Sequence, residues 1–195
     1  AEDGIAALKE RVDSLVVIPN DRIKLVTTER ITMKNAFEMA DEVLRQGVQS
    51  ISELILRPGD INLDFADVLA IMKDAGYAHM CVASAKGKDK AEQAAKMAAS
   101  SPLLETNISG AQGIVIQIIG SADLGLDEIT AAVEMITSES HPDATVIFGF
   151  AIDPTLEDEM RITLIATGFD ADKKAADARR QMQQAEAKSA SVEEF

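Results

Sequence analysis

The apolar positions of the chain follow a helical period over one long stretch. From Thr32 onward, apolar residues recur in alternating steps of three and four, and Arg57-Pro58-Gly59 is a strong helix stop. With Thr32 as N-cap, the helix spans about 26 residues and about 39 Å at 1.5 Å per residue. An apolar stripe on so long a helix suits an element that lies between two packed bodies.

The residues before this helix carry a shorter pattern. Their apolar positions predict a helix over residues 5–12 and a buried strand over 15–18, which ends at Pro19. A single apolar strand needs a sheet to join. This is a first hint that a part of the protein upstream of these residues is missing.

After the long helix, helical and strand patterns alternate. The pattern predicts a helix from Val68 to near Gly76, and Ile114-Val115-Ile116 is typical of a buried strand. Such alternation predicts one α/β domain over 68–169, with a mixed or mostly parallel sheet packed by helices. The expected strands are 78–85, 113–119, 145–151 and 161–166, and the other helices are 88–100 and 126–138.

Composition and charge narrow the class of protein. The chain has 195 residues with 19 Lys+Arg against 33 Asp+Glu, a formal net charge of −14. Nonspecific binding of nucleic acid or anionic membranes is therefore not expected, because Lys and Arg supply that affinity. The single cysteine, Cys81, permits no internal disulfide, and without a recognisable leader or spanning segment the cytoplasm is the expected location. Residues 170–195 have few large apolar side chains and are expected to form a flexible tail.

The usual catalytic signatures are absent from the sequence. No G-x-x-x-x-G-K-[ST] phosphate loop and no G-x-G-x-x-G after a strand occurs in the 195 residues. The two histidines, His79 and His141, lack a nearby cysteine or carboxylate at metal-ligand spacing. No metal site is expected, and both histidines are interpreted as structural.

The segment 62–67 is the first candidate site. Alternation places Ile61, Leu63 and Phe65 on one side, so that these apolar anchors could hold Asn62 and Asp64 rigidly toward solvent. The hypothesis is an outward-facing amide and carboxylate with a catalytic role.

Two readings of the acidic pair in this segment remain open. Asp67 follows Asp64 by three residues, which is the spacing of an N-cap and its N3 residue at a helix start. Helix starts of this kind are abundant, and on spacing alone capping is favoured over catalysis. The two roles can coexist.

The long helix carries the second candidate site. Phe37 and Asp41 are four residues apart and differ by only about 40° around the helix. A carboxylate therefore interrupts the apolar stripe. This position is either the partly solvated edge of the stripe or a notch that binds a nucleotide base. In the second case the ring of Phe37 stacks on a purine, and the carboxylate of Asp41 accepts hydrogen bonds from the N–H groups of the purine.

Several motifs together resemble a known family. They are Ile18-Pro19-Asn20-Asp21, Ala36-Phe37 with Asp41, Val43 to Gln49, Arg57-Pro58-Gly59, Asn62 to Val68, Ser100 to Glu105, Gly110 to Gly113, Asp153-Pro154, Asp158 to Arg161 and Ala166-Thr167-Gly168. In order and spacing they resemble the FtsZ family of bacterial cell-division proteins, which are tubulin-like GTPases whose filaments form the division ring. The resemblance covers residues 4–169, and N-L-D-F-A-D-V after a helix ending in R-P-G is highly specific.

The resemblance implies a fold. Residues 1–31 would be the remnant of the nucleotide-binding domain, 32–58 the central helix and 59–67 an interface loop. Residues 68–169 would be the C-terminal α/β domain with a four-stranded mixed sheet packed by helices, followed by the tail 170–195.

The resemblance also implies a function. Asn62, Asp64 and Asp67 would enter the nucleotide site of the adjacent subunit and help orient the water that attacks the γ-phosphate, while Phe37 and Asp41 would contact guanine. The cofactors of the intact protein would be GTP or GDP with Mg²⁺. The partners would be other FtsZ subunits, joined head to tail, and division-ring proteins, with no nucleic acid and no direct membrane insertion.

The sequence also departs from the family. The glycine-rich phosphate loop G-G-G-T-G-T-G is absent from these residues, Cys81-Val82-Ala83 stands where the family has G-x-G, and no family C-terminal peptide is recognisable. We expect a C-terminal fragment of FtsZ that binds no cofactor and hydrolyses no GTP alone but caps filaments. The alternative is a non-enzymatic FtsZ-like module for protein interactions.

Overall fold

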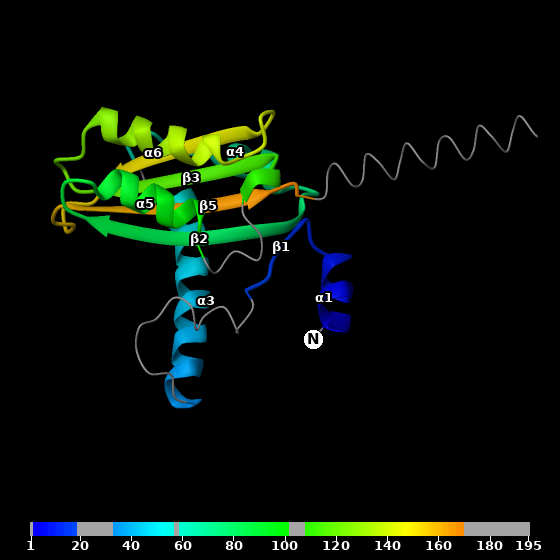
Figure 1. The fold of residues 1–195 in the computed structure, drawn as a ribbon. Helices are drawn as coiled ribbons and strands as arrows, with labels where there is room; N and C mark the ends of the chain where they lie inside the picture. The colour runs from blue at the N-terminus through cyan, green and yellow to red at the C-terminus, as the bar shows by residue number, and fades with distance from the viewer. Residues whose placement is uncertain (1, 19–32, 57–58, 102–107, 170–195) are drawn as a thin grey trace, which may run out of the picture.

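A long helix and a mixed sheet with helices on both faces make up the fold (Figure 1). The computed structural model describes residues 2–18, 33–56, 59–101 and 108–169. The predicted N-cap Thr32, the Arg57-Pro58 stop and the tail 170–195 lie outside the described residues. In chain order the described elements are α1 (Glu2–Lys9), β1 (Ser14–Val16), α3 (Met33–Leu56), α4 (Phe65–Met72), β2 (Gly76–Lys86), α5 (Lys90–Ala99), the 3-10 turn η1 (Ile108–Gly110), β3 (Gly113–Gly120), α6 (Leu126–Ser138), β4 (Thr145–Ile152) and β5 (Glu159–Thr167).

The sheet confirms the predicted mixed topology and corrects its size. Its order is β1-β2-β5-β3-β4, with β5 antiparallel to both β2 and β3, and with β3 parallel to β4. We predicted four strands, but within the described residues there are five, because β1 pairs in parallel with the start of β2. The short apolar strand thus finds its hydrogen-bond partners at an open sheet edge. The Gly76 amide donates to the Asp13 carbonyl at 2.9 Å beside this pairing.

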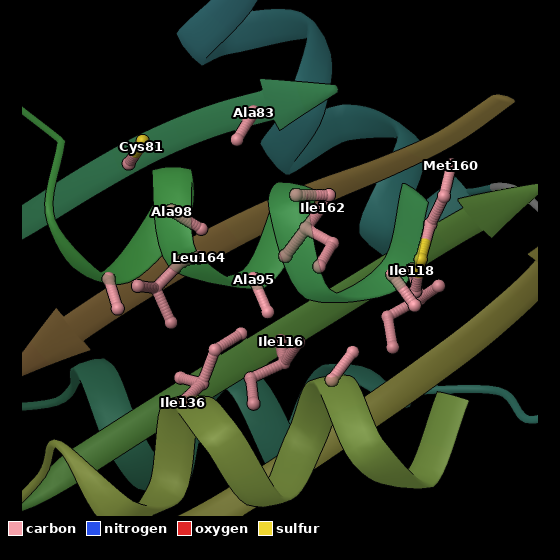
Figure 2. Close-up of a cluster of buried hydrophobic side chains, with 14 of the residues drawn as sticks. Cys81, Ala83, Ala95, Ala98, Ile116, Ile118, Ile136, Met160, Ile162 and Leu164 are labelled. Carbon is pink, nitrogen blue, oxygen red and sulfur yellow. The ribbon is translucent and has the colours of Figure 1, made fainter. Parts of the chain in front are cut away.

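One face of the sheet is covered by α5 and α6. Apart from Lys90, the buried residues of α5 are alanines, which let its backbone lie close to β2 and β5. Figure 2 shows Ala95 and Ala98 beside Ile116 and Leu164. Every residue of β3 is buried, which is typical of a strand covered on both faces.

The opposite face is covered by α4 and the C-terminal part of α3. Their cluster contains Leu54 of α3 and Val68 of α4 against Val115 and Ile165 of the sheet. A Cβ at Gly47 would lie 2.6 Å from Met80 Cε, so this glycine permits the close approach of α3 to β2. Of the two packed bodies that the apolar stripe led us to expect around this helix, the described residues include one, the sheet.

The other face of α3 is exposed in this chain. Phe37, Leu44 and Val48 are each more than 60% exposed and fall within about 40° of one another around the helix. Figure 1 shows the N-terminal part of α3 extending away from the sheet. The helix therefore carries a second apolar stripe that the described residues leave uncovered.

A buried lysine at the start of α5 forms ion pairs with two loops, the one between β3 and α6 and the one between β4 and β5. Lys90, at the start of α5, is 3% exposed, and its Nζ donates to Asp123 at 2.8 Å and to Asp158 at 2.9 Å. The hydrogen bond from Lys90, with a second from Ser121, lowers the pKa of Asp123 to about 2. Its two carboxylate partners raise the pKa of Lys90.

This cluster predicts an acid-dependent component of stability. The pKa of Asp123 lies below its unfolded value of about 3.9, so its contribution is present above that value and is lost as the pH falls from about 4 to about 2. Lys90→Met should therefore make the free energy of unfolding fall less steeply over this interval, as measured by urea unfolding at a series of pH values. The exposed neighbour Lys88, changed to Met, is the control. An unaltered slope in the Lys90 variant would contradict the prediction.

Candidate functional site

The acidic segment runs along the outer edge of β4. Gly59 follows the end of α3, and a Cβ there would lie only 2.3 Å from the Phe150 carbonyl oxygen. Ile61 forms a two-way bridge with Phe150: the Ile61 amide donates at 3.1 Å, and the Phe150 amide donates back at 2.9 Å. The Gly59 amide also donates to Oδ1 of Asn62 at 2.7 Å. The segment 59–64 is thus held in place by hydrogen bonds of its backbone. We call this segment, together with Asp67, the acidic turn.

The prediction of three apolar anchors on one side is wrong. Leu63 is buried at 7% exposure and packs in the α4 cluster, but Phe65 is 62% and Ile61 38% exposed. The reason is that α4 begins at Phe65, so the two-residue alternation of a strand ends there and the helical period takes over. Leu63 is the buried anchor of the turn.

The predicted capping role of Asp64 and Asp67 is confirmed. The Asp67 amide donates to Oδ1 of Asp64 at 2.8 Å, and the Asp64 amide donates to Oδ2 of Asp67 at 3.2 Å. This is a reciprocal capping box at the start of α4. Each of these bonds uses one oxygen of a carboxylate. Asp64 is exposed and Asp67 is half-buried, so both can also meet groups from outside the chain.

The chemistry open to the turn follows from its charge. Two carboxylates and an amide can accept hydrogen bonds from a water molecule and orient it. They repel a phosphate, so an anionic ligand has to be held by groups of opposite charge from elsewhere. Among the described residues, no group of three or more His, Cys, Asp and Glu side chains is arranged to hold a metal ion. The turn is suited to completing a site rather than to holding a nucleotide.

The second candidate site lies at the other end of α3. Phe37 is 66% exposed, and Asp41 is exposed one turn further along the helix. Fifteen residues separate Asp41 from the end of α3, which corresponds to about 22 Å. The structure therefore does not bring Phe37 and Asp41 together with the acidic turn.

Sequence reasoning missed the glycines that position the turn. Gly59 was interpreted only as a helix stop, and Gly149 of β4 drew no inference. A lone glycine inside a strand pattern is a signal for close approach of another segment, and this signal could have identified Gly149. Lys90 gave no signal, because its burial depends on carboxylates distant in sequence.

Comparisons with known proteins agree with this architecture. Residues 76–170 match the family described as FtsZ family, C-terminal domain. An empty FtsZ dimer from M. jannaschii is 40% identical with a TM-score of 0.81, over 88% of this chain and 50% of that one. A point mutant of M. jannaschii FtsZ is also 40% identical, with a TM-score of 0.79 over 85% and 50% of the two chains.

A more distant match shares the fold alone. GDP-form protofilaments of TubZ from Bacillus thuringiensis serovar israelensis are 13% identical, with a TM-score of 0.63 over 90% of this chain and 49% of that one. This chain therefore spans about half the length of the solved chains that it matches. In the described part of the chain, no helix combines the length and hydropathy needed to cross a bilayer. Because the family model matches residues 76–170 and the 40% identical FtsZ structures match 85–88% of the chain, the chain belongs to the FtsZ family.

Proposed function

We propose that this chain is the C-terminal part of a filament-forming cell-division GTPase, which acts in the cytoplasm at the division ring. In this proposal Asn62, Asp64 and Asp67 enter the nucleotide site of the adjacent subunit and complete it for GTP hydrolysis. The observation that carries the proposal is the acidic turn itself. It is fixed by backbone hydrogen bonds, its carboxylates are accessible, and its charge is unsuited to holding phosphate alone.

The position of the two candidate sites supports a head-to-tail arrangement. Phe37 and Asp41 lie toward one end of α3 and the acidic turn follows its other end. One subunit can therefore contact its own guanine through Phe37 and Asp41 while its acidic turn reaches the nucleotide of the next subunit. The matched structure described as an FtsZ dimer supports self-association of this kind.

The proposed chemistry relies on position and charge. Phosphoryl transfer has a loose transition state, so catalysis comes mainly from aligning the attacking water and stabilising charge. The free oxygens of Asp64 and Asp67 would accept hydrogen bonds from that water, and the capping box would keep both carboxylates in a fixed relation. GTP with Mg²⁺ would supply the reacting phosphate. The negatively charged nucleotide does not fit the acidic turn alone, so the subunit that binds the nucleotide must provide the positive charge that compensates its phosphates.

One prediction of the proposed function concerns filament assembly. Added in several-fold excess to full-length FtsZ, a polypeptide of these 195 residues should occupy exposed nucleotide faces and prevent further growth, because these residues contain no glycine-rich phosphate loop with which to receive another subunit. Pelletable polymer should decrease, as measured by sedimentation and light scattering with GTP. If polymer and GTP turnover both stay unchanged, the capping proposal fails.

The second prediction concerns hydrolysis in trans. Full-length FtsZ kept below its polymerisation concentration should turn over GTP faster when this chain is added, because the chain supplies the acidic turn. Asp64→Asn and Asp67→Asn should lower the stimulated turnover by orders of magnitude. Asparagine keeps a capping oxygen, so the stability of α4 should change little. Phosphate release measures the turnover, and thermal unfolding checks the fold.

The same experiment distinguishes the alternative. A non-enzymatic interaction module would bind FtsZ without stimulating GTP turnover. Replacement of Asp64 by alanine would then cost only about 1 kcal/mol of stability through the lost cap. Turnover that is equal with and without the chain, despite measured binding, would favour this module.

A further inference from the structure

Gly149 of β4 lies directly beneath the anchor of the acidic turn. It is buried and pairs with Gln117 of β3. A Cβ at this position would lie 2.9 Å from Cγ of Leu63 and 2.7 Å from Oε1 of Gln117. Real Cβ atoms essentially never approach other heavy atoms below 3.0 Å. The side chain of Leu63 therefore occupies the space that any side chain at position 149 would need.

The neighbouring residue of β4 fixes the backbone of the turn. Phe150 exchanges both backbone hydrogen bonds with Ile61, and its carbonyl lies too close to Gly59 for a Cβ there. Two consecutive residues of β4 thus define the position of the turn. One accepts the side chain of Leu63, and the other pairs with the backbone of Ile61.

This attachment is coupled directly to the carboxylates. Leu63 immediately precedes Asp64, and Asp64 is joined to Asp67 by the capping box. A shift of Leu63 away from the sheet must therefore move Asp64, and the capping box passes the shift to Asp67.

We propose that Gly149 and Leu63 are positioning residues for hydrolysis, and that they set how far the acidic turn projects from the sheet. This inference rests on the function proposed above. Neither residue touches the nucleotide in this account. Both act through Asp64 and Asp67, so they should affect turnover in the complex rather than the affinity of the complex.

The test is Gly149→Ala in the full chain, assayed with GTP-loaded full-length FtsZ kept below its polymerisation concentration. The added methyl group should displace Leu63 outward. A misplacement of about 1 Å can lower a rate by about 100-fold. We therefore expect maximal turnover to fall by about 10- to 100-fold. The half-saturating concentration of the chain should change less than about threefold, because the partner-contacting side chains are retained. Hydrogen exchange at the Ile61 and Phe150 amides should become faster.

Gly113→Ala is the matched control. A Cβ at Gly113 would crowd Ile71 Cγ2 at 2.8 Å and Thr167 Oγ1 at 2.7 Å, so it overpacks the same sheet to a similar degree. Its contacts lie at the C-terminal end of α4 and at the end of β5, away from the capping box. This variant should keep most of the stimulated turnover.

Leu63→Ala examines the same contact without overpacking. It should lower maximal turnover while binding persists, and it decides the question if Gly149→Ala does not fold. Full turnover in both variants, or an equal loss in the Gly113 control, would overturn the inference while leaving the proposed function intact. A wild-type chain that stimulates no turnover would instead overturn the proposed function and this inference with it.

Discussion

The backbone pairing of Ile61 with Phe150 joins three parts of this molecule. It links the end of α3, the acidic turn and the outer edge of β4. A segment between two helices would otherwise be an exposed loop with many accessible conformations. Fixed to a strand edge, the same residues present Asp64 at a defined place and start α4 there.

Much of the fold could be predicted from the sequence because its elements are long and strongly periodic. The strands over β2, β3, β4 and β5 and the helices α3, α5 and α6 lie where the apolar period places them, within a few residues at their ends. The strand over residues 15–18 was predicted, but its place in this sheet was not, since a short apolar segment does not reveal which edge it will join. Its pairing with β2 is determined by tertiary contacts.

The candidate site was predictable only where its interactions are local. The capping box joins residues three apart in sequence, and its spacing was sufficient to predict it. The orientation of Phe65 was predicted wrongly because the strand alternation was extended to this residue, whereas α4 begins there. The seat of Leu63 on Gly149 joins residues more than eighty positions apart, so no periodicity could have indicated it. The catalytic role of the turn was suggested by family resemblance and stays a prediction.

The alanine-lined side of α5 has a thermodynamic consequence of its own. Alanine has no rotamers to lose on burial, so the alanine positions of α5, unlike Lys90, add almost no side-chain entropy cost to its docking on the sheet. The apolar area in this layer comes instead from stiff β-branched isoleucines, whose χ1 angles are already restricted in a strand. Away from Lys90, ordering of this layer is therefore opposed chiefly by the backbone, which makes it a rigid layer over β2 and β5.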